Sequence, residues 1–166
     1  MKSVLLKFIS PILVIAVFCL DRVTKSMILA HFSFGESLRV LPFFDLTHYE
    51  NTGIAFGIGQ EKNRIFIALS SVLIIILLFL RRRWEKEHSG NMLLKIGLAL
   101  VIGGALGNLY DRIVYKSVID FLLFHIGEYQ WPAFNVADSA ICTGAFFLLF
   151  AHWREGKTPR SPEAAA

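Results

Sequence analysis

Two aspartates stand at the edges of apolar segments, where an ionised carboxylate is costly. Asp120 and Asp138 are each flanked by apolar and amide residues. Insertion scales place an Asp at the centre of a membrane span at about +2.5 to +3.5 kcal/mol, so a retained one usually serves chemistry, transport or an ion pair. Two carboxyl groups brought together in a low-dielectric site cannot easily both ionise, so one tends to hold a proton. Such a pair would meet the electrostatic requirement of an aspartic protease.

The composition is typical of a membrane protein. Of the 166 residues 55% are hydrophobic, the mean hydropathy is +0.56, and soluble domains are about 45–50% apolar. The formal net charge is +4. The basic residues of the chain cluster beside apolar blocks, as expected if they orient the chain in a membrane. They form no basic face interleaved with stacking aromatics, which argues against a nucleic-acid partner.

Four apolar blocks predict four transmembrane helices in a single domain over residues 1–153. A bilayer core of about 30 Å needs roughly 20 helical residues, and the blocks lie near 8–30, 65–80, 92–110 and 136–153. A secretory signal peptide is the alternative for the first block. Phe18 is bulky where cleavage wants a small residue, and the apolar character resumes at 27–30, so we favour a retained span.

The basic residues predict the orientation, because cytoplasmic flanks are enriched in Lys and Arg. They gather at the N-terminus, in the link between the second and third spans, and in the tail: Lys2, Lys7, Arg81, Arg82, Arg83, Lys86, Lys95, Arg154, Lys157 and Arg160. Both termini of this multi-pass chain are therefore expected in the cytoplasm. Residues 31–64 and 111–135 then face the outer side, and the polar tail 154–166 is expected to be disordered.

The first outer segment has strand-like character. Stretches 37–41 and 43–49 mix β-branched and aromatic residues around a Pro, and 51–53 has turn composition. They predict a small sheet on the membrane face within about 31–64. The second outer segment is too short for a domain, and its stretches 121–124 and 129–132 are amphipathic enough to rest at the interface.

Several charged residues have plainer explanations. Asp138 could simply N-cap the fourth helix, whereas Asp120 has no basic partner nearby in sequence. Asp21 and Lys25 are spaced i,i+4, which suits a structural ion pair. Asp111 could pair locally with Arg112, and Arg112 could equally neutralise a carboxylate in the site or hold a lipid headgroup.

The remaining reactive residue types give weaker signals. Gly103 and Gly107 form a GxxxG pattern, which we interpret as helix packing. Cys19 and Cys142 lie in apolar runs and are expected to be buried free thiols. The histidines have no metal-ligand spacing, so no metal is expected. Lys116 and Ser117 adjoin, but chain neighbours usually point apart, which disfavours a Ser–Lys protease.

Five blocks, in order and with matching spacing, resemble the lipoprotein signal peptidases, or signal peptidase II. They are residues 20–25 (LDRVTK), 49–57 (YENTGIAFG), 103–112 (GGALGNLYDR), 118–121 (VIDF) and 131–140 (WPAFNVADSA). Ile54 stands where the family commonly has Ala and Arg22 where Gln is common, and neither is expected to touch the two acids.

The resemblance implies a mainly α, four-helix membrane aspartic endopeptidase with an extracytoplasmic β-cradle. Asp120 and Asp138 would be the catalytic pair, and Asn51, Asn108, Arg112 and Asn135 would line and support the site. Asp21, Lys25, Gly53 and Asp111 would be structural.

The implied substrate is a prolipoprotein whose lipobox Cys carries diacylglycerol, cut just before that Cys. The implied enzyme uses no metal or organic cofactor. Its partners would be these substrates and membrane lipids, and a single site in one chain requires no dimer, so a monomer is expected. The rival class is a small transporter or assembly factor with proton-coupled acids, but a transporter would more naturally place an acid near mid-membrane.

Overall fold

The structure, a computed structural model, describes residues 2–53, 62–87 and 91–157, with side chains for 9–53, 62–84 and 91–154. The helices are α1 (Lys2–His31), α2 (Asn63–Glu87), α3 (Met92–Val114) and α4 (Val136–Lys157). The strands are β1 (Ser37–Leu41), β2 (Phe44–Asn51), β3 (Val118–Ile126) and β4 (Tyr129–Gln130). Ile54, part of one of the motifs above, lies outside the described residues.

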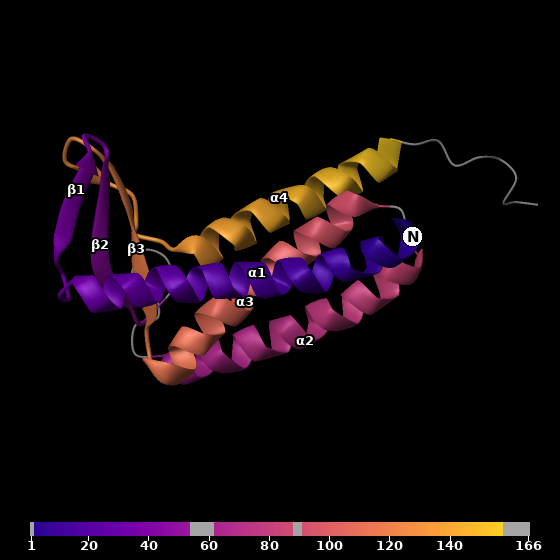
Figure 1. The fold of residues 1–166 in the computed structure, drawn as a ribbon, viewed down its shortest axis with the longest axis horizontal. Coiled ribbons are helices and arrows are strands. Elements are labelled where there is room, and N and C mark those ends of the chain that lie inside the picture. The colour runs from indigo at the N-terminus through magenta and orange to yellow at the C-terminus, as the bar shows by residue number, and fades with distance from the viewer. Residues whose placement is uncertain (1, 54–61, 88–90, 158–166) are drawn as a thin grey trace, which may run out of the picture.

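The helices run side by side along the long axis, and the sheet stands across one end of them (Figure 1). The N-terminus and the end of α4 lie at the opposite end (Figure 1). The described parts of both segments expected on one side of a membrane, 31–53 with 62–64 and 111–135, therefore lie at the sheet end of the molecule. α3 lies centrally and packs against each of the other three helices.

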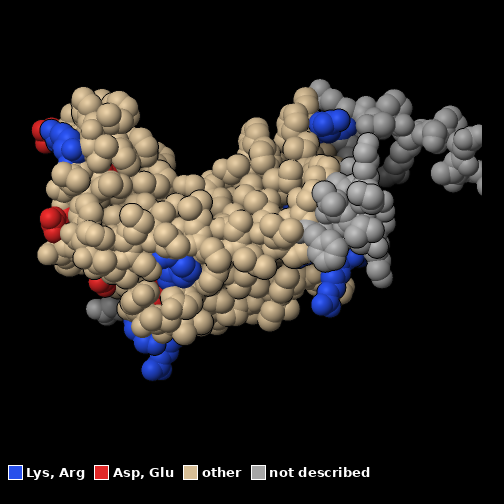
Figure 2. Space-filling view, in the orientation of Figure 1, with Lys and Arg blue, Asp and Glu red and all other residues tan. Residues whose placement is uncertain are grey.

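Three helices in the described part are long and apolar enough to cross a membrane: α2, α3 and α4. α1 has 30 residues, and the charged residues Asp21 and Lys25 in it are fully buried. Large apolar side chains instead face outward, such as Leu69 and Ile75 on α2. In the view of Figure 2, a largely uncharged belt covers the helices between charged groups near the two ends.

The sheet has four antiparallel strands in the order β1-β2-β3-β4. The predicted strand 37–41 is β1, and the predicted 43–49 largely coincides with β2. β3 and β4 were not predicted. The first four residues of β3 are all buried, so this strand has no polar–apolar alternation to reveal it.

The glycines of α3 permit close helix contacts, as the GxxxG pattern predicts. A Cβ at Gly103 would approach the Val17 side chain of α1 to 2.9 Å, and one at Gly107 would lie 2.5 Å from Asp21 Oδ2. A Cβ at Gly104 would collide with the Ala137 carbonyl oxygen of α4. These contacts hold the two helices that carry Asp21 and Asp138 against α3.

The expectation of buried cysteines is wrong. Cys19 and Cys142 are free, as expected, but both are exposed. An apolar run does not distinguish a helix face packed on protein from one that faces outward, because both are apolar in this fold.

Candidate active site

A buried cluster of four charges joins α1 to α3. Lys25 Nζ lies 2.9 Å from Asp21 Oδ2 and 2.7 Å from Asp111 Oδ2, and all three side chains are fully buried. Arg22 Nη1 contacts Asp111 Oδ1 at 2.5 Å, and its guanidinium lies over the Tyr110 ring. The predicted Asp21–Lys25 pair is therefore present, within a larger cluster of two cations and two anions.

The acids of this cluster also hold the segments that carry the candidate catalytic residues. Asp111 Oδ2 accepts a hydrogen bond from the backbone N–H of Ile119, the neighbour of Asp120, at 3.2 Å. Asp21 Oδ1 accepts one from the backbone N–H of Ala137, the neighbour of Asp138, at 3.0 Å. The Ala137 N–H belongs to the first turn of α4 and has no partner within the helix. Asp21 and Asp111 thus act on the site through the backbone.

Asn135, not Asp138, caps the start of α4. Asn135 Oδ1 accepts the backbone N–H of Asp138 at 2.9 Å, and Asp138 Oδ2 accepts the backbone N–H of Asn135 at 3.2 Å. This reciprocal pair is the arrangement of a capping box, with Asp in place of the usual Glu or Gln. The alternative in which Asp138 is merely the N-cap is wrong, because Asp138 follows the N-cap residue Asn135 by three positions and lies within the first turn of α4.

Asp120 accepts hydrogen bonds on both of its oxygens. Asn135 Nδ2 donates to Oδ1 at 2.7 Å, and Asn51 Nδ2 donates to Oδ2 at 3.1 Å. The sheet brings Asn51 into reach: it pairs with Val118, so Asp120 is its diagonal neighbour on the same face. Gly53 N–H donates to Asn51 Oδ1 at 3.0 Å, which turns the amide N–H₂ group toward Asp120.

Asn108 connects the charged cluster to Asp138. Lys25 Nζ donates to Asn108 Oδ1 at 2.9 Å, and Asn108 Nδ2 donates to Asp138 Oδ1 at 2.7 Å. Asn135 Nδ2 also donates to Asn108 Oδ1, at 3.2 Å. The two aspartates, from β3 and α4, are therefore joined by one continuous network in which Asn135 contacts both.

Asp120 is only 1% exposed, and this burial is the largest cause of its raised pKa. The pKa of Asp120 is raised from 3.8 to about 7, first by burial and second by the charge of the nearby Asp138. The hydrogen bonds from Asn51 and Asn135, and the charge of Lys25, oppose this rise in pKa. The Asp120 pKa of about 7 means that a proton remains on the pair over much of the physiological range.

Arg112 lies against the same site but does not pair with Asp111, so the local ion pair considered above is wrong. Asp111 is instead taken by Lys25 and Arg22. Arg112 Nη2 donates to the Gly53 carbonyl oxygen at 2.6 Å, and its guanidinium carbon lies 4.8 Å from the centre of the Phe66 ring.

Asn63, which the sequence analysis did not single out, supports Arg112. Its Nδ2 donates to the Arg112 carbonyl oxygen at 2.8 Å and so ties the start of α2 to the end of α3. The one signal for it is a polar residue just before the apolar run of the second span.

One cavity of about 440 Å³ contains both aspartates in its wall, together with Asn51, Asn108 and Arg112. Asn135, fully buried, stands behind it and bonds to both acids. The rest of the lining is mostly apolar and comes from all three of α2, α3 and α4, from Val118 of β3 and from the 131–134 segment, with Ser70 of α2 as its polar member. A second cavity of about 580 Å³, almost wholly apolar, shares Trp131 and Phe134 with the first.

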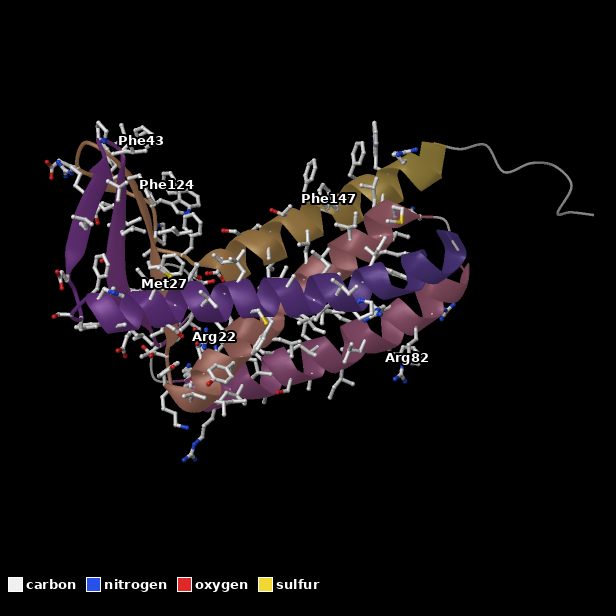
Figure 3. All side chains as sticks on the ribbon, in the orientation of Figure 1. Arg22, Met27, Phe43, Arg82, Phe124 and Phe147 are labelled. Atoms are coloured by element: carbon white, nitrogen blue, oxygen red, sulfur yellow. The ribbon has the colours of Figure 1, made fainter. Side chains whose placement is uncertain are left out.

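The second cavity is lined mostly by β3, β4 and the 131–134 segment, and its wall includes Phe43 and Phe124. Both lie toward the end of the sheet farther from α1 (Figure 3). In the space-filling view, the surface is hollowed between the sheet and the helices (Figure 2).

Other chemistries find little support. Ser117 Oγ donates to Glu50 and Lys116 Nζ to the Ile113 carbonyl oxygen, so the two do not form a Ser–Lys pair. Across the described ranges, no group of three or more His, Cys, Asp or Glu residues is arranged to hold a metal ion.

Comparison with known proteins agrees with this arrangement. The family described as signal peptidase (SPase) II matches residues 13–154. The lipoprotein signal peptidase of Syntrophotalea carbinolica is 44% identical over 148 residues, which cover 87% of this chain and 88% of that protein. The Azoarcus lipoprotein signal peptidase is 43% identical over 157 residues, covering 92% and 86%.

The fold is also that of known membrane enzymes. A bacterial membrane enzyme solved by the in meso method superposes with a TM-score of 0.81 at 29% identity, covering 92% of this chain and 93% of that one. A second, at 30% identity, gives a TM-score of 0.75 over 86% and 91%. The chain is thus a membrane protein of the peptidase class. It belongs to the signal peptidase II family, whose members are aspartic peptidases.

Proposed function

We propose that the protein removes the signal peptide from diacylglyceryl-modified prolipoproteins by cutting just before the lipid-modified Cys, with Asp120 and Asp138 as the catalytic pair. The observation that carries this proposal is that both carboxyl groups line one cavity while Asn135 bonds to each of them. The names of the relatives support the substrate class.

The chemistry follows from two carboxyl groups that share a proton. The ionised carboxylate takes a proton from a water molecule, whose oxygen attacks the scissile carbonyl carbon. The protonated carboxyl group donates to the carbonyl oxygen and stabilises the charge that develops on it. The tetrahedral intermediate then collapses and the C–N bond breaks. The leaving amine takes the proton that the carboxylate received from the water, and the proton on the former carbonyl oxygen returns to the other acid. The signal peptide keeps the new carboxyl group.

The proton belongs to the pair, because two strongly interacting groups titrate together. The Asp120 pKa of about 7 supports a singly protonated pair near neutral pH. Arg112, in the wall of the same cavity, adds a fixed positive charge that favours retention of the other carboxylate as an anion.

The two adjoining cavities support a lipid-modified substrate. The peptide bond would lie in the smaller cavity, beside the acids, and the apolar cavity beyond Trp131 and Phe134 offers room for acyl chains. Buried CH₂ groups contribute about 0.8 kcal/mol each when they leave water but little when they leave lipid. The acyl chains therefore locate the substrate more than they increase its affinity.

The topology is part of this proposal. α1 would be a fourth span, since its charged residues Asp21 and Lys25 pack inward against α3. Both termini would lie in the bacterial cytoplasm, and the sheet and the cavity would lie near the outer face of the inner membrane. Reporter fusions at the two ends and in the 111–135 segment test this orientation.

The rival class, a proton-coupled transporter, explains buried acids but not their neighbours. Both acids lie at the sheet end of the bundle, and every carboxylate oxygen of the pair accepts a hydrogen bond from an asparagine. A site fixed in this way suits hydrolysis better than a carrier whose acid must be exposed alternately to two sides.

The test is a gel-shift assay with a purified, diacylglyceryl-modified prolipoprotein in detergent or vesicles. We expect the wild type to release the signal peptide, and Asp120→Asn and Asp138→Asn to be folded and inactive. Asp45→Asn is the matched control, because Asp45 lies on β2 and pairs with His125. Full turnover by either of the first two variants would remove that acid from the mechanism.

A further inference from the structure

Three of the four hydrogen bonds to the aspartate pair are donated by asparagine side-chain amides and depend on how those amides are turned. An amide has one accepting and one donating end, so the partner at one end decides what the other end can do. Gly53 N–H fixes Asn51 through its Oδ1, and Asp138 N–H fixes Asn135 in the same way. Both anchors are backbone groups, which can only donate.

Asn108 is different, because its anchor is a side chain from another helix. Its Oδ1 accepts from Lys25 Nζ at 2.9 Å. An ammonium group has three donors and no acceptor, so Asn108 must present its oxygen to Lys25 and its Nδ2 to Asp138. The second contact to Asn108 Oδ1, from Asn135 Nδ2, is longer at 3.2 Å, and that nitrogen also donates to Asp120 at 2.7 Å.

We propose that Lys25 is a positioning residue of the catalytic pair: its ammonium group fixes the Asn108 amide so that Nδ2 donates to Asp138. This inference rests on the proposed function and adds to it a role for a residue that does not touch substrate. The contacts of Lys25 with Asp21 and Asp111 fix the position of the ammonium group. The charged cluster is therefore part of the hydrogen-bond network of the site as well as a link between helices.

The loss of Lys25 would leave only the longer contact from Asn135 Nδ2 on Asn108 Oδ1, and the amide would be held less firmly against turning. With Oδ1 toward Asp138, two acceptors would face each other, and only a protonated Asp138 could bond to Asn108. A turned amide would therefore favour a second proton on the pair, and a doubly protonated pair has no carboxylate to take the proton of the water. The charged groups that act on Asp138 come from three neighbouring elements: Lys25 from α1, Arg112 from α3 and Asp120 from β3. α2 faces the cavity with the uncharged Ser70 and Leu73.

A simple Lys25→Met variant would leave two buried acids with one cation and could fail to fold for that reason. The test therefore uses the double variant Asp21→Asn/Lys25→Met, in which Asp111 keeps Arg22 as its partner. Asp21→Asn alone is the matched reference, because it keeps Lys25 and its bond to Asn108. Comparison of the two isolates Lys25.

We expect the kcat of the double variant to be about tenfold to 100-fold lower than that of Asp21→Asn. KM should change little, as expected when a catalytic group is displaced. The acidic limb of its pH–rate profile should move to higher pH. In ¹⁵N spectra, the Asn108 side-chain amide should give one set of signals in the reference and split or exchange-broadened signals in the double variant.

Three outcomes would overturn the proposal. Equal kcat and pH profiles in the two variants would make Lys25 purely structural. A kinetic change with unaltered Asn108 signals would show that Lys25 acts by its charge alone. If the double variant does not accumulate, solid-state NMR of the labelled wild type decides: a correlation between Lys25 Nζ and Asn108 Cγ is expected, and its absence contradicts the geometry. Failure of the wild type to cleave would instead refute the proposed function.

Discussion

Asn135 and Asp138 bond to each other in both directions, backbone N–H to side-chain oxygen each way, at 2.9 and 3.2 Å. The first turn of α4 and a candidate catalytic acid are therefore one structural unit. Asn135 also donates its side-chain amide to Asp120, so the residue that begins the helix sets the relation between the two acids.

Substitution of Asn135 can separate its two roles. Asn135→Ala should lose a helix cap, at a cost of about 1 kcal/mol, and the donor to Asp120. Asn135→Ser should keep the cap but not that donor, so thermal unfolding should recover while cleavage stays at least about 100-fold reduced. Recovery of cleavage by Ser would show that Asn135 matters only for the helix.

The stability of the protein should depend on pH, and the raised pKa of Asp120 determines the direction of that dependence. The native state binds this proton more tightly than the unfolded chain, in which the Asp120 pKa is near 3.8. The contribution of Asp120 to the free energy of unfolding is therefore complete below about pH 4 and is lost as pH rises to about 7. The full effect corresponds to about 4 kcal/mol. Melting temperatures of the wild type should drop across this window, and those of Asp120→Asn should drop less. Parallel curves for the two proteins would show that Asp120 titrates normally.

Arg22 gives a prediction that separates the charged cluster from the catalytic pair. Arg22 contacts Asp111 and neither catalytic acid, and Asp111 keeps Lys25 and the Ile119 N–H as partners. Arg22→Gln should therefore destabilise the protein by about 1 to 3 kcal/mol while kcat stays within a few-fold of the wild type. Loss of cleavage in a fully stable variant would place Arg22 in the site itself.

Gly104 should tolerate no side chain. A Cβ there would strike the Ala137 carbonyl oxygen, and relief of this overlap moves α4, and Asp138 with it, away from Asn108. Gly104→Ala should cost about 1 to 3 kcal/mol and reduce kcat more than it raises KM. Ile113→Ala, on the same helix but half exposed, is the control. Normal kinetics for Gly104→Ala would mean that the two helices can separate without harm to the site.

The helices and the acids could be predicted from the sequence because each has a local signal. Apolar blocks of sufficient length mark the helices, Ser37–Leu41 has strand composition, and an acid beside an apolar run marks Asp120. β3 could not be predicted, because a strand buried from its first residue reads like any other apolar run. Cys19 and Cys142 were misplaced because apolar sequence does not reveal which helix faces pack on protein.

The hydrogen-bond network of the site could not be predicted from the sequence. The i,i+4 spacing of Asp21 and Lys25 predicts their pairing, but nothing local relates Lys25 to Asn108, which is 83 residues away. The same holds for Asn51 and Asp120, which the register of β2 and β3 brings together. The orientation of the Asn108 amide, which makes its Nδ2 a donor to Asp138, follows only from the full set of contacts.

The central claim is that Asp120 and Asp138 share one proton. Infrared spectroscopy of enzyme with ¹³C-labelled aspartate carboxyl groups measures this directly. We predict one protonated carboxyl band below a pH of about 7 that titrates away above it. In Asp120→Asn and in Asp138→Asn the band should titrate at lower pH than in the wild type, because each change removes the like charge of one acid while the other stays buried. A band that persists unchanged in either variant, or its absence from the wild type, would contradict the shared proton and with it the proposed mechanism.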